Sequence, residues 1–178
     1  MNTSARYWKI WRINPAAENL GYNKITVTTA QEFINSQFID IENSNFQNCL
    51  LSLFYGKNSQ TDTINRARAG LCLRCYISEA ILRECKKIDY LFSGEKQFNY
   101  RDLLPFVLND DGEKLILLDE DGKTQLIVDE DFKIKESKYN LFSVKVLQTF
   151  NADLQSRMSL DNWAYLQIKQ NHELKNFL

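Results

Sequence analysis

The sequence contains few of the residues that interrupt or cross-link a chain. Its 178 residues include only two prolines, six glycines and four cysteines, so long flexible linkers and a disulfide-bonded scaffold are not expected. No apolar run reaches about eighteen residues, so no transmembrane helix is expected, and the N-terminus lacks the apolar segment of a secretory signal. We therefore expect a cytoplasmic protein with no membrane partner.

Strong charge of one sign and histidine are also scarce. A formal net charge of -1 gives no overall attraction to nucleic acid or to an anionic membrane. His172 is the only histidine, and any Cys–His or Ser–His dyad would need it. The sequence has no Walker loop, no glycine fingerprint for dinucleotides, no nucleophile elbow and no metalloprotease helix. No catalytic residue and no cofactor are predicted.

The residues that are present indicate a globular fold. Hydrophobic residues make up 44% and charged residues 25% of the chain, which is typical of a soluble domain with a core. We predict an α+β domain that is mainly helical, with a small antiparallel β-hairpin or three-stranded meander around residues 107–135. Residues 1–106 form a mainly helical region with a short N-terminal strand pair. Residues 136–178 supply C-terminal helices that pack on it, and the whole is expected to be one domain.

The hairpin prediction depends on an acidic turn. Two apolar runs, residues 114–118 and 125–128, flank Asp-Glu-Asp-Gly at 119–122, and Gly122 can supply a positive φ without a steric penalty. Residues 132–134 are predicted to add a third strand. Asp119, Asp121 and Glu130 also match three positions of a calcium loop, but Lys123 occupies a ligand position. A plain hairpin turn is favoured.

Several shorter patterns predict the other elements. Residues 7–13 and 24–28 are strand-like, and Thr29 and Glu32 have the spacing of a capping box for a helix over 30–38. Residues 62–88 predict two helices that meet near Ser78, or one helix with a kink at 76–78. A short helix over 100–104 is expected to be limited by Pro105. Ser159 is predicted to cap a helix over 160–168.

The four cysteines allow three interpretations. Cys72 and Cys75 form a C-x-x-C pair, and with Cys49 and Cys85 they could hold zinc or an iron–sulfur cluster. They lie in apolar, helix-like sequence, however, and on a straight helix Cys85 would project roughly 140° away from Cys72. We favour buried core cysteines. A metal-stabilised structural domain, and an enzyme or redox sensor that uses a thiolate at Cys72 or Cys75, are the alternatives.

Candidate binding residues are basic and aromatic. An N-terminal segment could stack bases and contact phosphates, or could be an edge strand that covers the core. Its residues are Trp8, Lys9, Trp11 and Arg12. We expect three further arginines to be solvated or ion-paired and to steer a partner, namely Arg66, Arg68 and Arg74. An apolar C-terminal stretch, residues 174–178, would add binding energy.

Four stretches of the chain resemble a set of long cyanobacterial proteins of unassigned activity. They are ARAGLCLRCYISEAILRECKKID, FNYRDLLPFVLNDDG, DEDGKTQLIVD and SRMSLDNWAYLQIKQNHELKNFL, and the similarity spans residues 45–178. The chain resembles the N-terminal part of those proteins. Farther along, they carry a helix-turn-helix similar to sigma-factor promoter-binding regions, which this chain lacks. The resemblance implies a cytoplasmic, transcription-associated module and assigns no catalytic residue.

Together these patterns favour a non-enzymatic interaction module of a transcription-associated regulator. Its partner would be another protein, a longer parent chain or nucleic acid.

Overall fold

The computed structural model describes residues 3–17, 21–38, 46–56, 62–92, 98–138 and 140–177. Helices predominate, and two small antiparallel sheets of two and three strands accompany them, so the predicted α+β, mainly helical fold class is confirmed. Among the described helices, none combines the length and the apolar character needed to cross a membrane.

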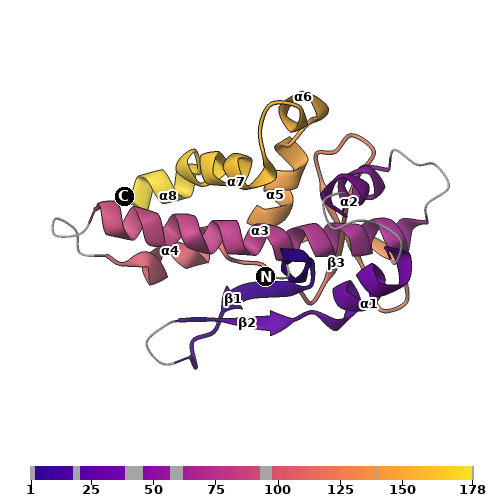
Figure 1. Cartoon of the computed structure of the whole chain (residues 1–178), viewed down its shortest axis with the longest axis horizontal. Helices are drawn as coiled ribbons and strands as arrows, with labels where there is room; N and C mark the ends of the chain where they lie inside the picture. Colours follow the sequence, from indigo (N-terminus) through magenta and orange to yellow (C-terminus); the bar gives the residue numbers. More distant parts are fainter. Residues whose placement is uncertain are drawn as a thin grey trace.

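The long helix α3 is the centre of the structure. It spans Thr63–Leu91 and is capped at its N-terminus by Asp62, whose carboxylate accepts a hydrogen bond from the Asn65 N–H at 2.7 Å. Helix α2 (Phe46–Phe54) packs closely against it, because a Cβ at Gly70 would lie 2.6 Å from the Phe54 ring. Figure 1 shows α3 along the long axis, with the other elements arranged around it.

The N-terminal segment lies along one side of α3. It consists of a 3-10 helix η1 (Thr3–Tyr7), strands β1 (Lys9–Ile13) and β2 (Tyr22–Thr26), and helix α1 (Thr28–Gln37). The two strands pair antiparallel, with Trp11 opposite Lys24. Ser78 fixes the strand to the helix, because its hydroxyl accepts a hydrogen bond from the Trp11 N–H at 2.9 Å.

The second sheet follows a short helix, α4 (Tyr100–Val107). Its strands are β3 (Leu115–Leu118), β4 (Gln125–Val128) and β5 (Ile134–Glu136), in the order β3-β4-β5. Strand β3 packs against α3, where Leu117 and Val128 form a small apolar cluster with Ala67. The predicted meander is therefore present.

The C-terminal helices cover another side of α3 (Figure 1). They are α5 (Phe142–Thr149), α6 (Ala152–Gln155), α7 (Leu160–Lys169) and α8 (His172–Phe177). Helix α7 contacts α3 and is capped by Ser159, as predicted, and α8 contacts α4 and α7. Side chains from all these elements join one large core.

Three local predictions are wrong. Helix α3 has no second N-cap at Ser78, because that hydroxyl donates to the Cys75 carbonyl at 2.7 Å and so is satisfied within a continuous helix. Helix α1 begins at Thr28 after Val27 with no side-chain cap, so the capping box at Thr29 is absent. Helix α4 continues through Pro105 to Val107, because buried apolar contacts outweigh one lost backbone hydrogen bond.

The third strand of the meander also differs from its predicted position. It begins at Ile134 and not at Phe132, because Phe132 has a φ of 62° and belongs to the preceding turn.

Candidate functional site

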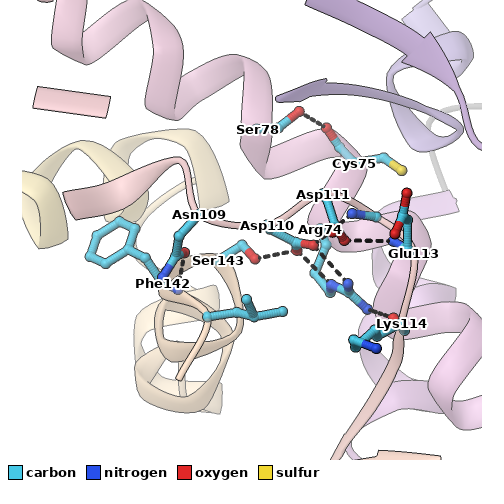
Figure 2. Close-up of polar contacts among 12 residues, drawn as sticks. Arg74, Cys75, Ser78, Asn109, Asp110, Asp111, Glu113, Lys114, Phe142 and Ser143 are labelled. Atoms are coloured by element: carbon cyan, nitrogen blue, oxygen red, sulfur yellow. Dashed lines mark hydrogen bonds and ion pairs between the residues drawn. The ribbon is translucent and has the colours of Figure 1, made fainter. Parts of the chain in front are cut away.

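A buried ion pair holds the second sheet to the central helix. Arg74 of α3 is fully buried and donates from Nε to Asp110 Oδ2 at 2.6 Å and from Nη2 to Asp110 Oδ1 at 2.8 Å. Its Nη1 donates to the Lys114 carbonyl at 2.7 Å. Ser143 of α5 donates its hydroxyl to Asp110 Oδ2 at 2.7 Å, and Gly112 donates its N–H to Oδ1 at 2.9 Å. Figure 2 shows the side chains of Arg74 and Ser143 pointing toward Asp110.

Both members of this pair stay charged. Burial raises the pKa of Asp110, but the Arg74 charge and the hydrogen bonds from Arg74, Ser143 and Gly112 outweigh it, so the pKa lies below its ordinary value. Burial lowers the pKa of Arg74, and Asp110 more than compensates. Of the two predicted environments for Arg74, the ion-paired one is present and the solvated one is wrong, because the side chain is fully buried. Its guanidinium links α3 to the sheet and to α5, and it offers no surface to a partner.

The loops beside this ion pair are tied to α5 as well. Asn109 accepts a hydrogen bond from the first N–H of α5, that of Phe142, at 3.0 Å. Gln125 of β4 is buried and exchanges two hydrogen bonds with the backbone of Leu141, at 2.9 Å and 3.1 Å. The inner part of the sheet is thus held by satisfied polar contacts on two sides.

The cysteines behave as core residues. Cys72, Cys75 and Cys85 are buried and free, and Cys49 on α2 is partly exposed. Burial raises the pKa of Cys72 and Cys75 well above the ordinary thiol value and raises that of Cys85 to about 12. These thiols stay protonated at neutral pH. Within the described ranges, no group of three or more His, Cys, Asp or Glu side chains could hold a metal ion.

The predicted aromatic and basic residues of β1 are used partly by the fold. Trp11 packs edge-on against Tyr22 with the two ring centres 5.4 Å apart, and the Lys24 ammonium lies 4.9 Å from the Trp11 ring centre. The Nη1 atom of Arg12 lies 3.6 Å from the Oε1 atom of Glu113. The remaining two, Trp8 and Lys9, are half-buried, and Trp8 packs against the core.

The other predicted arginines lie at the start of α3. Arg66 packs its guanidinium against Gly56, and Arg68 donates to the Asn65 side chain at 3.2 Å. In the described part of the chain, no hydrogen bond or ion pair joins either arginine to β1. The structure therefore does not bring the seven predicted binding residues into one site.

The apolar C-terminal stretch is only partly a surface. Leu174 is buried, whereas Phe177 is 42% exposed and packs against Phe98 and Phe106. Leu178 lies outside the described residues. Tyr90, at the end of α3, is 79% exposed, more than any other large hydrophobic residue in the described ranges.

The acidic turn before β4 is a hairpin turn. Asp119 accepts hydrogen bonds on its carboxylate from the N–H groups of Lys123 at 2.8 Å and Thr124 at 3.2 Å. The hydrogen bonds from the Thr124 and Lys123 backbone hold the pKa of Asp119 below its ordinary value. Gly122 follows with a φ of 70°. The predicted turn is confirmed.

The turn before β5 repeats this geometry with a different residue at its end. Asp129 accepts from the Lys133 N–H at 2.9 Å, as Asp119 does from Lys123, and the Phe132 N–H donates to the Asp129 carbonyl at 2.9 Å. Phe132 therefore occupies the left-handed position that Gly122 occupies in the first turn. For a bulky residue this conformation costs roughly 1–2 kcal/mol. Its side chain is nevertheless 65% exposed.

A cavity of about 700 Å³ lies beside this turn. Its apolar wall includes Leu71 of α3, Leu115 of β3 and Val128 of β4, and Phe132 lies at the turn. Ile134, the next apolar residue along the chain, is 50% exposed. Sequence reasoning missed this surface. The sequence Asp-Glu-Asp occurs in both turns, at 119–121 and at 129–131, and is followed by Gly122 in the first and by Phe132 in the second. This repeat was the signal that could have found the surface.

Comparison with known proteins finds no protein-family model, no curated protein and no solved structure that matches this chain.

Proposed function

We propose that this chain is a non-enzymatic interaction module of a transcription-associated regulator, and that it binds a protein partner at the surface around Phe132 and Ile134. The observation that carries the proposal is Phe132, which is exposed and held in an unfavourable backbone conformation. The transcription association is supported only by the resemblance of its sequence motifs. The interaction role does not depend on that resemblance.

Phe132 supports an interaction role because its place in the turn does not require a bulky side chain. Gly122 completes the equivalent turn without strain, whereas Phe132 adds strain and leaves most of its ring in water. A residue that costs stability at an exposed position is most simply explained by a contact made outside the chain. Aromatic side chains commonly anchor protein–protein contacts in this way.

The charges around Phe132 favour a protein over nucleic acid. Asp129, Glu130 and Asp131 precede it directly on the turn, and clustered carboxylates repel phosphates, whereas Lys133 and Lys135 follow it. The aromatic ring of Trp11, which could stack on bases, already packs against Tyr22 and Lys24.

The cysteines do not favour an enzyme or a redox sensor. Burial of Cys72 and Cys75 favours a core role over a reactive thiolate.

The experiment is site-specific photo-crosslinking in cells that make the protein. A photoreactive phenylalanine analogue replaces Phe132 in one variant and Phe92, which is 50% exposed at the end of α3, in the matched control. We expect one discrete protein adduct from position 132 and none of the same mass from position 92. A third variant carries the photoreactive residue at position 132 together with Ile134→Lys. It tests whether the adduct needs the neighbouring apolar contact.

The outcomes separate the parts of the proposal. An adduct whose partner belongs to the transcription machinery supports the full proposal, whereas a discrete partner from another process leaves the interaction role and removes the transcription association. No adduct, or equal adducts from positions 132 and 92, would contradict the interaction role. An adduct with DNA or RNA would replace it by the nucleic-acid alternative.

A further inference from the structure

Strand β5 directs alternate backbone groups toward its neighbour β4. The Lys133 carbonyl accepts a hydrogen bond from the Asp129 N–H at 2.9 Å, and the Ser137 N–H donates to the Gln125 carbonyl at 2.9 Å. In an antiparallel pair, residues alternate between those bonded to the neighbouring strand and those that face away from it. Lys135 lies between these two residues and therefore also faces β4.

The two remaining residues of the strand face outward. Ile134 and Glu136 direct their N–H and C=O groups to the side where the described residues add no further strand to the sheet. All three residues of β5 are exposed. The strand thus presents two N–H donors and two C=O acceptors at the spacing that another extended chain requires.

The side chains along this edge differ between its two faces. Ile134 lies on the face of Val128, its register partner, which lines the 700 Å³ cavity and packs toward α3. Lys133 and Lys135 lie on the opposite face, since side chains alternate along a strand. Lys135 is 67% exposed and its only described ion-pair partner is Asp129 at 3.4 Å. One face of the edge therefore carries Ile134 and Glu136, and the other carries the two lysines.

We propose that β5 is a docking edge for an extended segment of a partner protein. The segment adds as a fourth strand, places apolar side chains beside Ile134 and Phe132, and places acidic side chains opposite Lys133 and Lys135. This inference rests on the proposed function and specifies its binding mode. The partner is thus a strand in which apolar and acidic residues alternate.

A second copy of this chain fits the edge poorly. If two β5 strands paired antiparallel through their outward groups, Ile134 would lie opposite Ile134 or Glu136 of the other copy. In the first register Lys133 faces Lys135, and in the second Lys135 faces Lys135. Like charges directly opposite each other destabilise a strand pair. The same lysines attract acidic side chains, so charge favours a different chain as the occupant.

The test is selection from a library of random twelve-residue peptides displayed on phage, with the intact chain as bait. Selected peptides are synthesised, and their binding is measured by titration. Amide hydrogen exchange, followed by NMR, then reports on Ile134 and Glu136. We expect peptides with alternating apolar and acidic residues, at least tenfold slower exchange at both amides, and at least tenfold weaker binding when the acidic residues are replaced by lysine.

Proline variants isolate the backbone contribution. Ile134→Pro removes an outward N–H that the fold does not use, and we expect at least a tenfold loss of peptide binding with the fold retained. Ile134→Thr is the matched control, because it keeps the N–H and shortens the apolar side chain. If Ile134→Pro fails to fold, Glu136→Pro tests the same point at the other outward N–H.

Failure of this inference differs from failure of the proposed function. Selected peptides that require Phe132 but leave the two amides unprotected would overturn strand addition while the interaction role stands. Selection of basic alternating peptides, or self-association of the chain through β5, would overturn the acidic partner. Peptides whose binding is unchanged by Phe132→Gly would contradict both proposals.

Discussion

The two sides of the three-stranded sheet are built in opposite ways. On the inner side, Asp110 and Gln125 satisfy buried polar groups of α3 and α5, and β3 packs against α3. On the outer side, β5 is exposed along its whole length, and Phe132 keeps a strained conformation with its ring in water. The inner side is explained by stability alone. The outer side is not.

This difference separates residues that hold the fold from residues that are free to bind. Arg74 was a candidate binding residue because arginine suits anions, but its burial and its bidentate contact with Asp110 assign it to the inner side. Phe132 has the reverse character. Four measurements test the contrast, from the largest expected effect to the smallest.

Breaking the buried ion pair should have the largest effect. Asp110→Ala leaves the Arg74 charge buried without its partner, and we expect a loss of about 3–5 kcal/mol in the free energy of unfolding. Replacing both residues, as Arg74→Met with Asp110→Leu, should recover most of this loss, because no unpaired charge remains. Chemical denaturation measures both. Asp111→Ala, at an exposed neighbouring carboxylate, is the control, and an equal loss there would remove the distinction between inner and outer sides.

Acid should weaken the inner side through the same carboxylate. The folded state holds the pKa of Asp110 below the 3.8 of an unperturbed aspartate, so its ionised form stabilises the fold above that pH. The contribution is lost as the pH falls through the lowered folded value. We expect the unfolding free energy of the native chain to fall more steeply between pH 4 and pH 2 than that of Asp110→Asn. Parallel curves would show that Asp110 does not couple to folding.

Exchanging the residues of the two acidic turns should change stability in opposite directions. Phe132→Gly relieves the left-handed strain, and we expect a gain of about 1 kcal/mol. Gly122→Ala introduces strain at the equivalent position, with a loss of about 1 kcal/mol. Thermal and chemical unfolding measure both changes. A stability loss in Phe132→Gly would mean that the ring supports the fold, which would contradict its proposed role in binding.

The smallest effect is expected at the free edge. Ile134 is half exposed, so Ile134→Thr should change the unfolding free energy by no more than about 0.5 kcal/mol. The same substitution should weaken binding of the selected peptides, but by less than Ile134→Pro does, because threonine keeps the outward N–H. Unfolding experiments and peptide titrations carried out on one preparation separate the two effects. A large stability change with unaltered binding would place Ile134 on the inner, structural side of the comparison.

Periodicity and turn chemistry predicted most of the elements. The helix that follows Asp62, the helix capped by Ser159 and the hairpin around Gly122 depend on neighbouring residues only, and the structure contains all three. The helix break predicted at Ser78 is absent, because the Ser78 hydroxyl bonds to a distant partner, the Trp11 N–H, as well as to the local Cys75 carbonyl. Local sequence does not contain such a contact.

Composition and spacing also indicated that the cysteines are core residues, since they lie in an apolar, helix-like segment. They did not indicate that Arg74 would pair with Asp110 inside the fold, because its partner is distant in the sequence. Asp110 lies 36 positions from Arg74 and meets it only when the loop after α4 folds back onto α3. The strain at Phe132 likewise requires a backbone angle, which the order of residues does not state.

The order of residues therefore decided the fold class, the helices, the hairpin and the apolar character of the core, since all depend on interactions between neighbours in the chain. Tertiary structure alone decided which charge is buried, which edge of the sheet is free and which aromatic ring is left in water. Those properties arise from contacts between distant segments, and burial changes the chemistry of a side chain without changing its identity.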